Sequence, residues 1–248
     1  MSADAVYRKI ARPDARLVAR AAACAMSDLY EAMDANRRDA ALMRPAMRPL
    51  VAGLRIAGPA VTARCAPRDN LMMHRALLCA APGDVLVVQA EEPAAAQWGM
   101  LAAVYAEHKG LAGVVVEGCI RDVDDLTGRR FPVWFTGVSP AHPDKRGPGA
   151  VNVPVVCGGV NVRPGDVVCA DGDGVLVVRP DELLAAITGA ERRQQREAGD
   201  IAEIKAGRSL FEIHALAAPL ASSGVPEIDG AWQAGKDAGN LNPVKQPK

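Results

Sequence analysis

Residues 110–126, GLAGVVVEGCIRDVDDL, decide the fold of this chain. The three valines at 114–116 are β-branched and predict a buried strand, with a glycine shortly before and after it. The polar run RDVDD that follows predicts the start of a helix. Because side chains at the carboxyl end of such a strand face a crevice, we expect the Arg-Asp pair at 121–122 to face one.

The composition favours a protein that works on small molecules. The 248 residues allow one large domain or two small ones, and half of them are apolar, which is enough for a sizeable core. Basic and acidic residues number 29 each, so the formal net charge is zero and no basic face for nucleic acid is indicated. Trp, Tyr and Phe number three each, which is few for a surface that stacks bases.

The cysteines and the start of the chain predict a cytoplasmic protein. The six cysteines form no CxxC motif and mostly lie in apolar runs, so we interpret them as small buried residues of a reducing compartment. The alanine- and arginine-rich start is interrupted by acidic residues and lacks the apolar core of a signal peptide. No run reaches the roughly 20 apolar residues that span a bilayer, so no membrane partner is expected.

Apolar runs and turn residues predict alternating helices and strands. Helices are expected over 14–25, 27–35, 71–81, 94–109 and 181–216, the last with breaks near Gly199 and Gly207. Strands are expected over 85–88, 131–135 and, in short pieces, 153–178, with two strands around a Gly58-Pro59 turn within 53–65. A polar connector is expected over 37–49 and an exposed loop over 139–150. This rhythm predicts one α/β domain over 1–222, with a central layered sheet, helices outside it and a C-terminal helix, followed by a loose tail over 223–248.

A second polar segment precedes the central strand. After the strand at 85–88, the sequence QWGMLA (97–102) lies near the start of a helix, where several N–H groups lack intrahelical partners and attract an anion. If the two strands are neighbours, Arg121 and Asp122 open onto the same crevice. A guanidinium can pair with a carboxylate or an oxo group, and an aspartate can hold a divalent metal. The sequence therefore predicts a pocket for a small 2-oxo acid.

These residues also have structural explanations that involve no ligand. Asp122 could cap the helix that follows it, with Arg121 paired to a nearby aspartate. Gly99 alone is more often a packing position than a ligand contact, and His74 is more often structural than catalytic. No G-x-G-x-x-G, Walker or G-x-S-x-G motif is present, so dinucleotide, nucleotide triphosphate and serine-hydrolase functions lack support.

Four segments together resemble a known family. They are DNLMMHRALLCAAPGDVLVV (69–88), WGMLAAVYAEHKGLAGVVVEGCIRDVDDL (98–126), FPVWFTGVSP (131–140) and VVCGGVNVRPGDVVCADGDGVLVV (155–178). The ordered set is similar to the 4-hydroxy-4-methyl-2-oxoglutarate and 4-carboxy-4-hydroxy-2-oxoadipate aldolases, which share the RraA fold with the regulators of ribonuclease E activity. The similarity runs over most of residues 15–215.

The resemblance implies a fold, an assembly and an activity. The fold is a swivelling β/β/α layered domain, assembled as trimers or hexamers with active sites between subunits. The activity is a retro-aldol cleavage that depends on Mg²⁺ or Mn²⁺ and releases pyruvate, often with oxaloacetate decarboxylation as a side activity.

The family's pattern also assigns roles to residues of this chain. Its G-x-x-R-D motif falls on Arg121 as the substrate-binding arginine and on Asp122 as the metal-binding aspartate, which the regulators typically lack. The backbone that holds the pyruvate carboxylate falls on Gly99, Met100, Leu101 and Ala102. A catalytic glutamate from a neighbouring subunit's C-terminal helix best matches Glu197.

One position departs from the aldolases. There, an aspartate or glutamate that helps to hold water on the metal follows the glycine of the WG pair, whereas this chain has Met100. A thioether is a poor ligand for magnesium and cannot carry a proton. Either another acid compensates, with Glu91, Glu92 and Glu117 nearest in sequence, or the protein is a weakened relative. A non-catalytic binding or regulatory protein, or an enzyme that only decarboxylates a 2-oxo diacid, are the alternatives.

Overall fold

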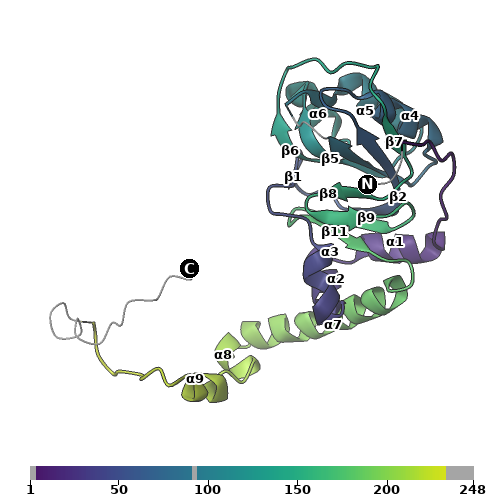
Figure 1. The fold of residues 1–248 in the computed structure, drawn as a ribbon. Helices are drawn as coiled ribbons and strands as arrows, with labels where there is room; N and C mark the ends of the chain where they lie inside the picture. Colours follow the sequence, from purple (N-terminus) through teal and green to yellow (C-terminus); the bar gives the residue numbers. More distant parts are fainter. Residues whose placement is uncertain (1–3, 91–93, 233–248) are drawn as a thin grey trace. The chain divides into compact units, whose positions relative to one another are not determined.

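The computed structural model describes residues 4–90 and 94–232. The chain forms two compact units, Met1–Arg196 and Glu197–Lys248. The first unit contains the sheet, as Figure 1 shows, and the residues of the candidate site belong to it as well. The second begins within the long helix α7 and continues through two short helices. Their bounds are α7 Leu183–Lys205, α8 Leu210–Ile213 and α9 Ala217–Ser223.

A mixed sheet forms the centre of the first unit. The strands are β1 Arg48–Pro49, β2 Ile56–Cys65, β3 Val85–Ala90, β4 Ala96–Trp98, β5 Gly113–Ile120, β6 Val133–Val138, β7 Gly149–Val151, β8 Val155–Cys157, β9 Val160–Val162, β10 Val167–Ala170 and β11 Val175–Val178. Among the described residues the main sheet has the order β1-β6-β5-β3-β2-β10-β11, with β4 paired to β5 and β7 to β2, while β8 and β9 pair separately. Strands β2, β3, β5 and β6 are parallel to their neighbours in that series, so their carboxyl ends share one edge.

Helices and a second layer of strands cover the two faces of the sheet (Figure 1). The remaining helices are α1 Ala15–Ala23, α2 Met26–Ala32, α3 Ala35–Ala41, α4 Leu71–Cys79, α5 Met100–His108 and α6 Val123–Arg129. In β3, Leu86 and Val88 pack in a cluster with α4 and α5, whereas Val85 and Val87 pack in a cluster with β8 and β9. Burial on both faces explains why β3 and β5 are continuous apolar runs. The predicted α/β class, with helices outside a layered sheet and a C-terminal helix, is confirmed.

The prediction of two strands around a Gly58-Pro59 turn is wrong, because β2 runs through this dipeptide without a break. Gly58 is needed there for close packing, since a Cβ atom at this position would lie 2.3 Å from the carbonyl oxygen of Gly83. Pro59 lies where β2 pairs with β10, and pairing with β3 begins only at Ala60. The proline therefore precedes the parallel ladder that its missing N–H group would interrupt.

The prediction of a single helix over 94–109 is also wrong. Ala96 and Trp98 pair with Cys119 and Ile120 of β5, so the segment begins as strand β4 and becomes helical only after Gly99. The predicted connector over 37–49 likewise contains the end of α3 and strand β1.

Helix α7 passes through Gly199 and ends before Gly207, which has a φ of +97°. The break expected near Gly207 is therefore confirmed, and the one near Gly199 is not. The six cysteines, all within the described residues, form no disulfide bond, and burial raises the pKa of the Cys169 thiol to about 12, as expected for an inert core residue. No helix within the described residues is long and apolar enough to cross a membrane.

Candidate functional site

Asp122 directs its carboxylate toward the start of helix α5. The residue follows β5 and has a left-handed backbone with φ of +60°, which is uncommon outside glycine and often marks a functional site. Its side chain makes no hydrogen bond to cap α6. Instead, Asp122 Oδ2 accepts the backbone N–H of Met100 at 2.9 Å. The explanation of Asp122 as a side-chain helix cap is therefore wrong.

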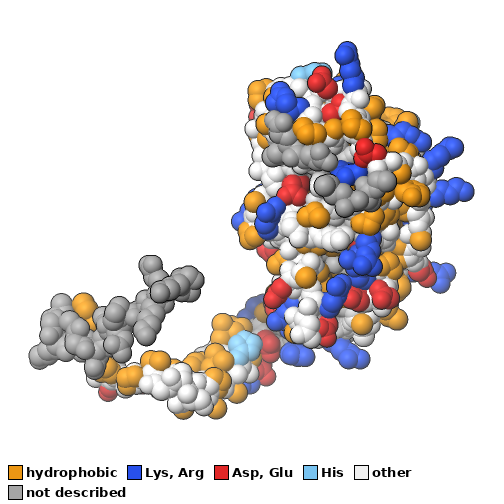
Figure 2. Space-filling model, viewed as in Figure 1, with side chains coloured by type: hydrophobic (Ala, Val, Ile, Leu, Met, Phe, Trp, Pro, Cys, Tyr) orange, Lys and Arg blue, Asp and Glu red, His pale blue; other side chains and the backbone are white. Residues whose placement is uncertain are grey.

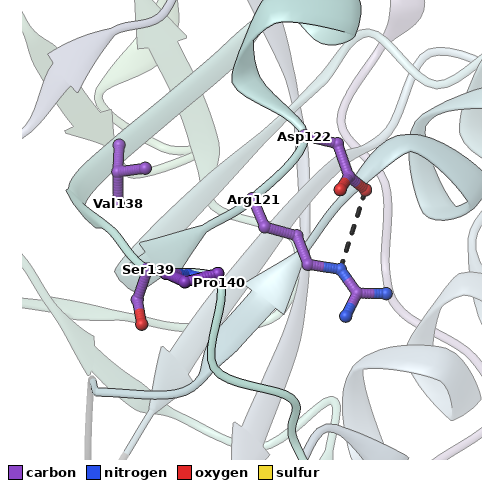
Figure 3. Close-up of a pocket in the computed structure, with 5 residues that line it drawn as sticks. All are labelled: Arg121, Asp122, Val138, Ser139 and Pro140. Carbon is purple, nitrogen blue, oxygen red and sulfur yellow. Dashed lines mark ion pairs between the residues drawn. The ribbon is translucent and has the colours of Figure 1, made fainter.

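Arg121 lies beside Asp122 at the carboxyl end of β5. Its Nε atom is 3.6 Å from Asp122 Oδ2, and Figure 3 shows both side chains at the edge of one cavity. Its Nη1 atom is 3.4 Å from Nδ1 of His142. The side chains of Arg121 and Asp122 are 38% and 36% exposed, so their ion pair contributes little to stability and the guanidinium remains accessible to a ligand.

Gly99 provides the space that this pair occupies. A Cβ atom on Gly99 would lie 2.7 Å from Asp122 Oδ2 and 3.1 Å from Arg121 Cγ. The φ of Gly99 is −168°, which any residue adopts, so the requirement for glycine is one of space. Gly99 is thus a packing position whose neighbours are the two candidate site residues.

Two cavities meet at Arg121. The larger measures about 310 Å³ and is lined by Arg121, Asp122, Val138, Ser139 and Pro140 (Figure 3). The smaller measures about 110 Å³, and its lining consists of Asn70, Met73, His74, residues 96–102, Arg121, Pro143 and Lys145. The predicted substrate-binding backbone of residues 99–102 therefore lies in the same cavity as Arg121, as the sequence led us to expect.

Comparison with known proteins identifies the family of this chain. A sequence model of the RraA-like family, described as Aldolase/RraA, matches residues 26–177. The chain belongs to the RraA-like family. A protein of Halalkalibacterium halodurans named as a candidate 4-hydroxy-4-methyl-2-oxoglutarate aldolase is 37% identical over 149 residues, which are 60% of this chain and 71% of that protein. A Burkholderia multivorans protein with the same name is 41% identical over 55% of this chain and 83% of its own length.

Solved RraA structures share the fold. RraAS2 of Streptomyces coelicolor, titled an unusual member of the RNase ES inhibitor RraA protein family, is 30% identical, with a TM-score of 0.68 over 81% of this chain and 100% of its own. The RNA-processing inhibitor RraA from Thermus thermophilis is 32% identical, with a TM-score of 0.51 over 55% of this chain and 84% of its own. The relatives of this chain thus include both proteins named as aldolases and proteins named as inhibitors.

A buried aspartate holds the loop that closes one side of the RraA-like site. Asp69 is 3% exposed, and its Oδ2 accepts the N–H groups of Arg146 at 2.6 Å and Gly147 at 2.7 Å. Its Oδ1 accepts the N–H of Leu71 at 2.8 Å. Burial alone would raise the pKa of Asp69, but these three hydrogen bonds outweigh it and hold the pKa below its ordinary value. The anchored loop supplies Lys145 to the smaller cavity.

Replacing Asp69 by asparagine is expected to lower the free energy of unfolding at pH 7 by about 1–3 kcal/mol, because an amide group cannot accept all three N–H bonds. A group whose pKa is lowered on folding stabilises the protein above its unfolded-state pKa, and this contribution is lost as the pH falls through the folded-state value. The difference between wild type and variant, measured by urea unfolding, should therefore shrink toward acid pH.

The control for this variant is Asp144→Asn. Asp144 joins the same loop to Asn70 and Arg68 through its backbone, so the amide should be tolerated. Equal unfolding free energies for wild type and Asp69→Asn at pH 7 would contradict the assigned role of Asp69.

The acidic residues that could replace the missing carboxylate at position 100 lie in different parts of the chain. Glu117 pairs with Arg44 at 2.5 Å and accepts the N–H of Gly158 at 2.9 Å, so it links three segments of the fold and is not a free acid. Glu91 and Glu92 lie outside the described residues. Glu197 is exposed on α7 in the second unit, and its expected role in a neighbouring subunit stays a prediction.

The donor set at Asp122 fits a hard divalent cation held by a single carboxylate. No cluster of three or more His, Cys, Asp or Glu side chains suited to a metal occurs in residues 4–90 and 94–232. Magnesium, however, is often bound through one or two carboxylates, with substrate oxygens and water completing its shell. The hydrogen bond from Met100 and the ion pair with Arg121 both use Oδ2 of Asp122, which leaves Oδ1 available to a cation.

The sequence predicted ligand contacts for the backbone of residues 97–102, but several polar side chains of the smaller cavity were not predicted to contact a ligand. They are Asn70, Gln97 and Trp98, together with His74, which the sequence favoured as structural. The segment around Gln97 was expected to be helical. The pairing of β4 with β5 brings Gln97 and Trp98 beside the strand that ends at Arg121, and Asn70 and His74 reach the same cavity from α4.

Proposed function

We propose that this protein is a divalent-metal-dependent aldolase that cleaves a 4-hydroxy-2-oxo diacid into pyruvate and a second 2-oxo acid. One observation carries the proposal. The carboxylate of Asp122 and the guanidinium of Arg121 lie together at the end of β5, beside the first turn of α5. Relatives named as aldolases, 37% and 41% identical to this chain, support the same reaction class.

Each residue has a defined task in the proposed reaction. Arg121 binds the 2-oxo oxygen of the substrate and stabilises the negative charge that develops there as the C3–C4 bond breaks. The N–H groups of Leu101 and Ala102, in the first turn of α5, bind the adjacent carboxylate. Asp122 would hold Mg²⁺ or Mn²⁺, which supplies Lewis-acid polarisation of the 2-oxo group when bound. Gly99 keeps the backbone close enough for these contacts.

We also propose the assembly and partners that the resemblance to the aldolases implies. The substrate is a small 2-oxo acid, and the assembly is a homotrimer or hexamer in which Glu197 of one subunit completes the site of another. Neither nucleic acid nor a membrane is a proposed partner. On the visible face in Figure 2, acidic and basic side chains are both scattered over the first unit, in keeping with the zero net charge.

A second candidate is a regulatory protein on the same scaffold. It is favoured by Met100, which cannot act as an acid or base, and by the relatives named as RraA inhibitors. An enzyme that only decarboxylates a 2-oxo diacid is the remaining alternative. Pyruvate release from a 4-hydroxy-2-oxo diacid, compared with release from oxaloacetate, distinguishes the aldolase, the decarboxylase and the regulator. An aldolase releases pyruvate from both compounds or from the first alone, a decarboxylase only from oxaloacetate, and a regulator from neither.

If the natural protein is a weakened enzyme, replacing Met100 by aspartate should raise aldolase turnover by at least about tenfold. General acid–base catalysis typically increases a reaction rate by about 10² to 10⁴-fold. Met100 lines the same cavity as Arg121, so a carboxylate there can accept a proton. The measurement is kcat on 4-carboxy-4-hydroxy-2-oxoadipate at saturating magnesium.

Val104→Asp is the matched control, because it adds the same charge to an exposed position one turn later on α5. Robust wild-type turnover without a gain in Met100→Asp would show that Met100 is no defect and that another group carries the proton.

A further inference from the structure

Four side chains form a polar chamber within the smaller cavity: Asn70, His74, Gln97 and Trp98. Each has a buried polar atom with no hydrogen-bond partner among the described residues. These atoms are Asn70 Oδ1, His74 Nε2, Trp98 Nε1 and both amide atoms of the Gln97 side chain. Gln97 is 0% exposed and Asn70 is 6% exposed. Because leaving buried polar atoms unpaired costs free energy, the polar chamber is suited to a polar ligand fragment.

Among the described residues that line this cavity, one side chain can accept a proton from a hydroxyl group at neutral pH. The titratable side chains of the cavity are His74, Arg121 and Lys145. Arginine and lysine side chains donate hydrogen bonds but have no acceptor atom, and the side chains of Asn70, Gln97 and Trp98 are not bases. Met100, in the same cavity, has no group that accepts a proton. His74 is therefore the candidate acceptor.

The surroundings of His74 keep its imidazole neutral. Burial lowers the pKa of His74 first, and the positive charge of Lys145 lowers it further, while Asp69 opposes them. A neutral ring with an unpaired Nε2 atom is ready to act as a base at pH 7.

We propose that His74 is the base that removes the C4 hydroxyl proton of the 4-hydroxy-2-oxo acid, a role that rests on the proposed aldolase function. The Nε2 atom takes the hydroxyl proton, and the O–H electrons form the new carbonyl at C4. The C3–C4 bond breaks, and its electron pair moves through C3 and C2 to leave an enolate beside Arg121. The imidazolium then returns its proton to C3, which gives pyruvate and restores the neutral ring.

This assignment predicts a difference between two reactions of one variant. Aldol cleavage needs a base for the hydroxyl proton, whereas oxaloacetate has no such hydroxyl group and loses carbon dioxide from its carboxylate. In the full-length protein with saturating magnesium, His74→Gln should lower kcat for aldol cleavage by about 10² to 10⁴-fold. Its oxaloacetate decarboxylation should fall much less. A damaged fold or a lost substrate pocket would lower both reactions together.

The pH profile supplies a second readout. In wild type, kcat/KM for cleavage should fall as the pH drops through the lowered pKa of His74, that is, below the ordinary histidine value of about 6.5. This acidic limb should be absent from the residual activity of His74→Gln. His108→Gln is the control, because His108 is an exposed histidine at the end of α5, and it should match wild type in both reactions.

Three results would overturn the role of His74. Equal cleavage by wild type and His74→Gln would leave the aldolase function standing and exclude His74 as the base. An equal loss of cleavage and decarboxylation would assign His74 a structural role. A wild type that releases no pyruvate from any 4-hydroxy-2-oxo acid would overturn the aldolase function together with the role of His74.

Discussion

Asp122→Asn is expected to abolish metal-dependent pyruvate release while leaving the fold intact. The amide oxygen of asparagine can still accept the N–H of Met100, as Asp122 Oδ2 does at 2.9 Å. The lost ion pair with Arg121 is about one-third exposed, and such pairs contribute about 0–1 kcal/mol to stability. What the amide lacks is the negative charge that attracts a hard divalent cation.

Two measurements separate the loss of metal binding from the loss of structure. Magnesium binding is followed by calorimetric titration, and the unfolding midpoint is measured in parallel. The control is Asp124→Asn, an exposed carboxylate in the first turn of α6, two residues along the chain. Unchanged turnover in Asp122→Asn would show that Asp122 does not hold the metal.

The second large effect is expected at Arg121. Replacement by lysine keeps one positive charge but removes the planar guanidinium, which can donate to two oxygens at once. Loss of a donor to a developing oxyanion lowers kcat by about 10²- to 10³-fold, and we expect an effect of this size. The measurement is kcat for aldol cleavage and for oxaloacetate decarboxylation, since both pass through the same enolate. Both should fall together, unlike in His74→Gln.

Arg129→Lys is the matched control for this substitution. Arg129 also forms a partly exposed ion pair, with Glu107, but it lies at the far end of α6 and outside both cavities. An unchanged kcat in Arg121→Lys would show that charge alone suffices and would contradict a directed guanidinium contact.

Much of the fold could be predicted because burial dictates residue type. The valines of β3 and β5 are buried on both faces of the sheet, so the sequence pattern there is unambiguous. Gly58-Pro59 was misjudged, because its turn-like composition serves close packing against Gly83 within a long strand. Local composition cannot reveal a neighbour that is distant in sequence.

Part of the candidate site could also be predicted, because it follows a recognisable buried strand. Arg121 and Asp122 follow a strongly apolar strand, so their place at the end of β5 could be read from the chain. The place of Gln97 in the smaller cavity could not be predicted, because its segment has helical composition and becomes a strand only by pairing with β5. The buried contacts of Asp69 with Arg146 and Gly147 span more than seventy residues, and no local pattern indicates them.

The most direct test is pyruvate release by the wild-type protein from 4-carboxy-4-hydroxy-2-oxoadipate. We expect turnover with Mg²⁺ or Mn²⁺, loss of turnover after a chelator is added, and recovery when excess metal is restored. A protein that binds magnesium yet releases no pyruvate from this or any other 4-hydroxy-2-oxo diacid would contradict the proposed aldolase function.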